Sequence, residues 1–157
     1  MYRKILMTHD GSELASEAVA HVVELARLGQ SEVLLLRVTD TPGQTLTRLG
    51  GGWAAAGEVA AEAAVEETQR HDTEAVAQLS ALREQLHARG VERVSIEVVE
   101  GAPGPAIIEV AAQQGCDLIV MATHGRSGLG RAVLGSVADH VIRHSSIPVL
   151  LVRPASA

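Results

Sequence analysis

Short apolar runs alternate with stretches of helical spacing along this chain, and the alternation constrains its fold more than any other feature. Residues 34–36 (LLL) and 118–122 (LIVMA) are continuously apolar. Such strands are covered on both faces, as in a parallel sheet between helices. The pattern predicts an α/β, Rossmann-like fold with an open five-stranded parallel sheet, right-handed crossovers and helices on both faces. The expected strands are Lys4–Thr8, Ser31–Val38, Val94–Val99, Leu118–Ala122 and Pro148–Val152.

Four segments between these strands have the spacing of amphipathic helices. In the first, residues 12–28, Ser12 is the expected N-cap and Gly29 the C-terminal stop. Residues 74–89 and 105–114 supply two more, and Ser136 is expected to cap the last. The residues expected to face inward in the first and last helices are Leu14, Ala18, Val22, Leu25 and Leu28, and Val137, Val141 and Ile142.

Composition favours one domain over residues 1–157 and excludes several classes of partner. The net charge of −6 argues against a broad nucleic-acid surface, and the chain has no Phe for stacking bases. No apolar run is long enough to span a membrane. The N-terminus is interpreted as the first strand, not as a signal peptide. The single cysteine, Cys116, is expected to be inert core and suits a reducing compartment, so we expect a cytoplasmic protein.

Polar or glycine-rich segments follow three of the predicted strands. They are Thr8-His9-Asp10-Gly11, Val38-Thr39-Asp40, and the glycine-rich segment 122–136. Ligands of open α/β sheets bind beyond the carboxyl ends of the strands, where the strand order reverses. The three segments should therefore meet at one edge of the sheet, which is the predicted ligand site.

The segment Ala122–Ser136 indicates a phosphate site. A glycine-rich loop between a buried strand and a helix start directs backbone N–H groups and the helix dipole at one anion. Arg126 and Arg131 are able to neutralise phosphate oxygens, and His124 is a candidate hydrogen-bond donor to them. No Gly-Lys-Ser/Thr triplet is present, so the loop is not a P-loop.

The chain resembles the universal stress protein family. The family signature, Gly-x2-Gly-x9-Gly-Ser/Thr, matches Ala122, Gly125, Gly135 and Ser136 in spacing. The opening KILMTHDGSELASEAVAHVVELA and the closing IPVLLVRP are also similar, and only Asp40 to about Arg70 departs from the family pattern. The first signature position is Ala122 instead of glycine. Alanine suits a strand end unless the backbone there has a positive φ or a ligand packs against Cα.

The resemblance implies a homodimer that binds an adenine nucleotide, usually ATP. Carried over by position, Asp10 would contact the adenosine, the Val38 backbone would read the adenine edge and Thr8 would line the base pocket. The residues that would hold the phosphates are Gly125, Arg126, Gly135 and Ser136, next to Ala122 and His124. Mg²⁺ is expected to bridge the phosphates. Dimerisation is also expected from the residues, because an apolar last strand, 147–152, needs cover if it lies at an edge.

These observations favour a stress-response ATP-binding sensor or regulatory module over an enzyme. No dedicated acidic pair for Mg²⁺ is visible, and no catalytic residue is assigned. Slow hydrolysis, or autophosphorylation at Ser136 or Thr123, stays open. The alternatives are an ATPase or adenylate-forming enzyme on the same scaffold, and a nucleotide-free dimeric adaptor in which Ala122 has abolished binding.

Three further features of the sequence carry expectations about the surface. His140 and His144 are four residues apart, but no third ligand is near, so both are expected at the surface and no metal site is predicted. Asp139 and Arg143 are expected to form a surface pair. The Gly-rich insertion around 40–57 is expected to be flexible. It is either a lid over the site or a loop without a role.

Overall fold

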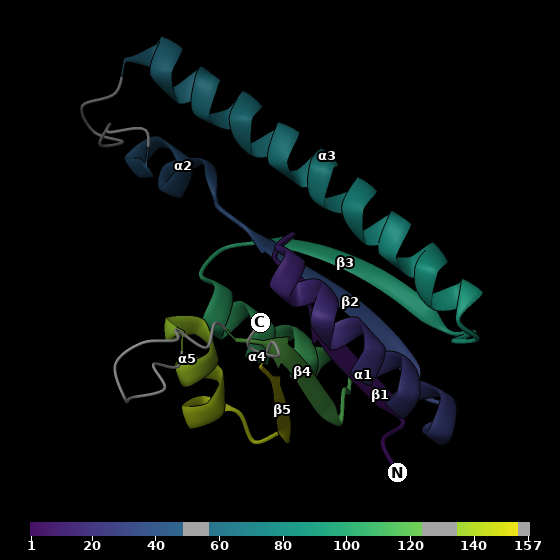
Figure 1. The fold of residues 1–157 in the computed structure, drawn as a ribbon. Coiled ribbons are helices and arrows are strands. Elements are labelled where there is room, and N and C mark those ends of the chain that lie inside the picture. Colours follow the sequence, from purple (N-terminus) through teal and green to yellow (C-terminus); the bar gives the residue numbers. More distant parts are fainter. Residues whose placement is uncertain (49–56, 124–134, 154–157) are drawn as a thin grey trace.

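The computed structural model describes residues 1–48, 57–123 and 135–153. Its centre is a five-stranded sheet in the order β3-β2-β1-β4-β5, and every strand pairing is parallel (Figure 1). The predicted fold class is therefore confirmed. The strands are β1 (Lys4–Thr8), β2 (Glu32–Thr39), β3 (Val94–Glu100), β4 (Leu118–Ala122) and β5 (Val149–Val152).

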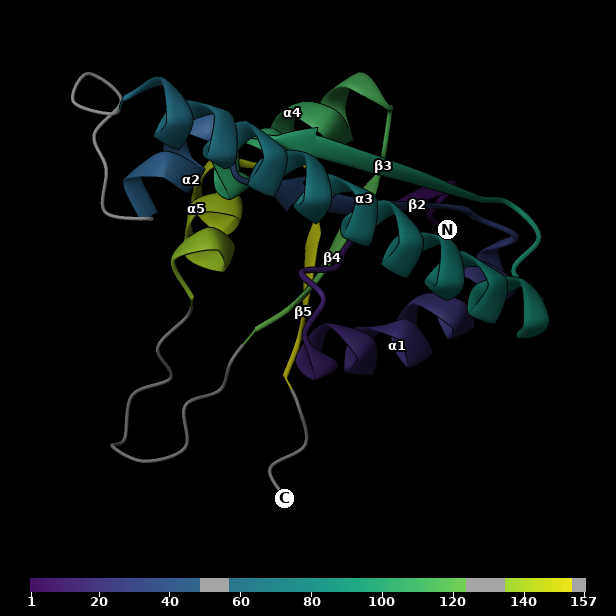
Figure 2. The same ribbon diagram turned by 90° about the horizontal axis from the view of Figure 1, so that it is seen from above.

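Two layers of helices enclose the sheet, with α1 and α3 on one face and α4 and α5 on the other (Figure 2). Alternation along β1 serves both layers, because Ile5 and Met7 pack in the first core and Leu6 in the second. All three are fully buried, as expected for a central strand. The helices are α1 (Glu13–Gly29), α2 (Pro42–Arg48), α3 (Glu58–Ala88), α4 (Pro103–Gln113) and α5 (Ser136–His144).

The ends of α1 follow the sequence pattern closely, but its buried face does not. Ser12 is the N-cap, and its Oγ accepts a hydrogen bond from Ala15 N at 3.2 Å. The helix ends at Gly29, followed by Gln30 in the left-handed region at φ 50°. The prediction for Leu28 is wrong, since its side chain is 69% exposed. Leu28 lies in the last turn, beyond the covered part of the helix, and Ala26 is its last buried residue.

Helix α5 corrects two further predictions. Its N-cap is Gly135, and Ser136 is its first helical residue, so Ser136 does not act as a side-chain cap. Ala138 and Val141 are buried three residues apart, whereas Ile142 is 44% exposed. The predicted pair of Asp139 and Arg143 is confirmed at 2.8 Å.

The region after β2 forms a helical hairpin. Helix α3 is one continuous helix of 31 residues, much longer than the helix expected over residues 74–89. The N-terminal half of α3 extends beyond the sheet, and α2 packs against that half of the helix (Figure 1). Residues 42–48 of the expected flexible insertion are therefore helical. Residues 49–56 lie outside the described part of the chain.

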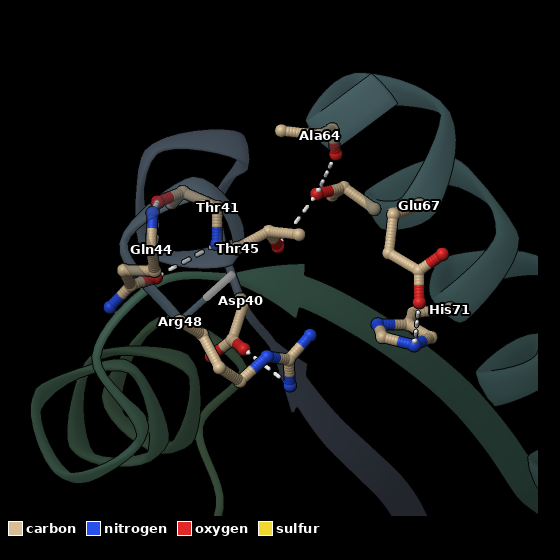
Figure 3. A network of polar contacts seen from close by, with 9 residues as sticks. Asp40, Thr41, Gln44, Thr45, Arg48, Ala64, Glu67 and His71 are labelled. Carbon is tan, nitrogen blue, oxygen red and sulfur yellow. Dashed lines mark hydrogen bonds and ion pairs between the residues drawn. The ribbon is translucent and has the colours of Figure 1, made fainter. Parts of the chain in front are cut away.

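A buried hydrogen bond joins the two helices of the hairpin. The hydroxyls of Thr45 and Thr68 are 3.0 Å apart, and Thr68 Oγ1 also donates to Ala64 O at 2.9 Å (Figure 3). An ion pair of 3.0 Å between Arg48 and Asp40 ties the far end of α2 back to the end of β2. Thus the hairpin has a polar centre of its own, separate from the two main cores.

Candidate functional site

A cleft of about 270 Å³ opens at the carboxyl ends of the strands. It lies where the order reverses, because β1 is flanked by β2 on one side and β4 on the other. The predicted site residues in the described part of the chain all line it. These are Thr8, Asp10, Val38, Ala122, Gly135 and Ser136. The other predicted residues, His124, Gly125 and Arg126, lie outside the described residues.

Asp10 is held by the start of α1. Its Oδ1 accepts hydrogen bonds from Ser12 N at 3.0 Å and Ser12 Oγ at 2.6 Å. Partial burial alone would raise the pKa of the Asp10 carboxyl, but the hydrogen bonds from Ser12, together with smaller effects of His9 and the local backbone, lower that pKa overall. Asp10 is therefore ionised at neutral pH. Among the described residues nothing donates to its Oδ2, which leaves that oxygen for a ligand hydroxyl or N–H.

His9 belongs to the same turn and is uncharged at neutral pH. Its Nδ1 accepts a hydrogen bond from Gly11 N at 3.1 Å. Burial lowers the pKa of His9; the Asp10 charge raises it, and the Arg37 charge lowers it further. A neutral imidazole with Nδ1 engaged by backbone serves as scaffold for the turn more readily than as a general base.

The end of β4 forms another wall of the cleft. Ala122 pairs with Val152 of β5, and Thr123 N donates to Val152 O at 3.0 Å. Within the described residues Gln30 alone combines a side chain with a positive φ, so Ala122 has ordinary strand geometry that its methyl group tolerates. The Thr123 side chain is only 5% exposed, and its buried hydroxyl has no hydrogen-bond partner in the described structure.

The N-terminus of α5 faces the cleft without a side-chain cap. Gly135 has extended backbone angles, φ −61° and ψ 148°. As a glycine it has no side chain to accept hydrogen bonds from the first turn of the helix. Ser136 is exposed at the first helical position. Unpaired N–H groups and the helix dipole together favour an anion at this end of the cleft.

Sequence reasoning missed the apolar floor of the cleft. Leu36, Met121 and Ile107 contribute to it, together with Pro103 at the start of α4. Alternation along β2 places Leu36 on the same face as Val38, and this signal was readable in the sequence. The contribution of α4 depends on how that helix docks, which local patterns do not specify.

Two absences apply to the described residues alone. They contain no cluster of three His, Cys, Asp or Glu side chains able to hold a metal, and none of their helices is long and apolar enough to cross a membrane.

The paired histidines of α5, His140 and His144, stack on each other with ring centroids 4.3 Å apart. Cys116 is buried, and burial raises its pKa to about 11, so the thiol is unreactive.

The fold and the cleft define a class of α/β proteins that bind ligands at a switch point. Comparison with known proteins narrows this class, because the model of the universal stress protein family matches residues 1–153. Universal stress protein MJ0531 of Methanocaldococcus jannaschii is 35% identical over 153 residues, which cover 98% of this chain and 83% of that protein. The chain belongs to the universal stress protein family.

Solved structures agree with this assignment. The structure of MJ0577, from the same organism, superposes with a TM-score of 0.79 at 31% identity and covers 100% of this chain and 99% of its own. A universal stress protein solved in complex with cAMP shares the fold, with a TM-score of 0.69, 23% identity and 97% of each chain covered.

Proposed function

We propose that the cleft binds an adenine nucleotide, with ATP as the physiological ligand, and that the protein is a nucleotide-responsive regulatory module of the stress response. The observation that carries the proposal is the convergence of three chemically different surfaces on one cleft. These are an apolar floor, an ionised carboxylate and an uncapped helix N-terminus. The cAMP complex of a protein with the same fold supports the choice of an adenine nucleotide.

Each surface suits one part of the ligand. The apolar floor around Leu36 and Met121 suits the base, with the Val38 backbone at its edge. The free oxygen of Asp10 suits the ribose hydroxyls. The N-terminus of α5 at Gly135 and Ser136 suits the phosphates, and the family signature adds Gly125 and Arg126. Mg²⁺ would be held by the phosphate oxygens, since the described residues offer it no cluster of carboxylates.

The same geometry favours binding over turnover. Rapid phosphoryl transfer needs a base or a positioned water besides charge neutralisation. His9 Nδ1 already accepts a hydrogen bond from Gly11 N, and the hydrogen bonds from Ser12 make the Asp10 carboxylate a weaker base. We therefore propose a module that hydrolyses ATP at well below about 1 s⁻¹, the low end of typical enzymes. If the protein phosphorylates itself, exposed Ser136 is a better acceptor than buried Thr123.

We also propose that β5 pairs with its copy in a second chain. β5 is an edge strand of the sheet, and Val149, Leu150 and Leu151 are only half-buried. A second copy would cover both the apolar side chains and the unpaired strand edge. Light scattering at micromolar concentration should give twice the mass of one chain, and a strictly monomeric protein would refute this pairing.

Calorimetric titration tests nucleotide binding. Co-purified nucleotide is first identified by mass spectrometry and removed, and ATP, ADP, AMP, cAMP, adenosine and GTP are then compared. We expect adenine compounds to bind more tightly than GTP. Asp10→Asn should lower their affinity about 10- to 100-fold, because a hydrogen bond to a charged group contributes about 1.5–3 kcal/mol. Asp40→Asn, which removes a carboxylate outside the cleft, is the matched control.

A negative result would be informative. If no adenine compound produces heat or a thermal shift at millimolar concentration, the nucleotide proposal is wrong and the adaptor hypothesis is favoured. If steady turnover exceeds about 1 s⁻¹ in a phosphate-release assay, the protein is an enzyme and the binding-module proposal fails.

A further inference from the structure

The turn that carries Asp10 packs against Arg37, whose side chain lies on the face of the sheet covered by α1 and α3. We define the Asp10 loop as residues 9–12. Its Gly11 has φ +85°, and a Cβ there would lie 2.5 Å from Nη1 of Arg37 and 2.9 Å from Oε1 of Gln78. The backbone of the loop therefore rests directly on these two side chains. A larger residue at Gly11 would have to push them away.

Arg37 and Gln78 form a pair that is independent of the cleft. Arg37 lies on β2 between Leu36 and Val38, whose side chains face the cleft, so its own side chain points to the face covered by α1 and α3. There Arg37 Nη1 donates to Gln78 Oε1 of α3. Within the described residues no carboxylate forms an ion pair with this guanidinium.

We propose that Arg37 is a positioning residue for the Asp10 loop, and that Gln78 holds it against Gly11. The inference extends the proposed nucleotide binding and rests on it, because the loop presents Asp10 to the adenosine. It links helix α3, which bears the helical hairpin at its other end, to the ligand-binding turn. Nothing in the sequence pattern indicates this link, since Arg37 and Gln78 are 41 residues apart.

The charge of Arg37 has a second effect on the loop. The charged groups that act on His9 are Asp10, which raises its pKa, and Arg37, which lowers it in addition to burial. A neutral His9 accepts the hydrogen bond from Gly11 N, and a protonated one has no lone pair at Nδ1 to accept it. Removing the Arg37 charge should therefore make the loop sensitive to mildly acidic pH.

The test uses Arg37→Met, which keeps the apolar stem and removes the guanidinium. Arg37→Lys keeps the positive charge, and Gln78→Ala removes the hydrogen-bond acceptor of Arg37. Arg70→Met is the matched control, because it deletes an exposed arginine from the surface of α3. The first measurement is amide hydrogen exchange of residues 9–12 in nucleotide-free protein. The second is the dissociation constants of adenosine and ATP at pH 8 and pH 6.

We expect Arg37→Met to speed amide hydrogen exchange in the loop. We also expect it to raise the dissociation constants of adenosine and ATP by the same factor, about tenfold. Equal factors are expected because both ligands share the adenosine part. The loss should grow at pH 6 and be smaller in Arg37→Lys, whereas Arg70→Met should behave like the wild type. Gln78→Ala added to Arg37→Met should have little further effect.

Unchanged loop exchange together with unchanged adenosine affinity in Arg37→Met would overturn the inference, even if the protein were less stable. A wild-type protein that binds neither adenosine nor ATP would refute the proposed function instead. In that case hydrogen exchange in the loop still decides whether Arg37 holds it.

Discussion

Replacing Ser12 by alanine removes two interactions from the start of α1. The Ser12 hydroxyl accepts from Ala15 N at 3.2 Å, and loss of such an N-cap costs about 1 kcal/mol. It also donates to Asp10 Oδ1 at 2.6 Å. Because Asp10 is partly open to water, we reduce the usual value for a charged hydrogen bond to about 1 kcal/mol. Ser12→Ala should therefore lower the free energy of unfolding by about 2 kcal/mol and Tm by about 4–8 °C.

The effect should depend on pH. The folded-state pKa of Asp10 is lowered, so its contribution is present above the unfolded value of 3.8 and is lost as pH falls through the folded value. Without the Ser12 hydroxyl that contribution is smaller at neutral pH. The difference between wild type and variant should therefore shrink from about 2 kcal/mol at pH 7 toward about 1 kcal/mol, the N-cap part, as pH falls below 3.8 and through the folded-state pKa of Asp10.

Urea unfolding followed by circular dichroism, at several pH values between 7 and 3, measures this difference. Ser16→Ala is the control, since Ser16 is exposed within the same helix and its replacement should change stability by less than about 0.5 kcal/mol. A Ser12→Ala protein as stable as the wild type at pH 7 would refute the reasoning. A difference that does not change with pH would refute the role given to Asp10.

Three further substitutions test other parts of the structure. Ala122→Gly should leave ATP affinity within about threefold and cost about 0.5–1 kcal/mol in urea unfolding, because the methyl sits in ordinary strand geometry; a large gain in calorimetric affinity would show that the methyl obstructs the ligand. Gly104→Ala should lower Tm, with a cost of about 1–3 kcal/mol, because the new Cβ would lie 2.6 Å from the His140 ring; an unchanged melting curve would contradict the contact between α4 and α5. Thr68→Val should cost about 1–3 kcal/mol by leaving the buried Thr45 hydroxyl without its partner. Thr73→Val removes a similar bond to the helix backbone at an exposed position, and an equal loss in both variants would argue against the buried pair.

The strands were predictable because their apolar runs are short, continuous and bounded by polar residues. Lys4–Thr8 and Leu118–Ala122 begin and end where the pattern places them, and β2, β3 and β5 differ by one residue at one or both ends. Helix faces were less predictable. Leu28 fits a helical stripe, but α1 extends beyond the surface that would cover it, and Ile142 lies beside the stripe of α5 that buries Ala138 and Val141. The periodicity of a helix does not show how far along it the packing continues.

The site followed from topology more than from any motif. The carboxyl ends of neighbouring parallel strands must meet, so Thr8, Asp10, Val38 and Ala122 were brought to one edge without knowledge of side-chain packing. The contributions of Ile107 and Arg37 depend on the docking of α4 and α3 onto the sheet. No local pattern encodes these contacts, which is why they were found only in the structure.

The place of β1 at the centre of the sheet has a consequence for the order in which the protein folds. β1 pairs with β2 after one helix, but its other neighbour, β4, is more than a hundred residues away, since Ile5 lies opposite Leu118. Contacts so distant in sequence form slowly and late. During synthesis β1, β2 and α3 have left the ribosome well before β4. The cleft, which needs a wall from β4, then forms in one of the last steps, and a ligand bound there would stabilise only chains that have completed their fold.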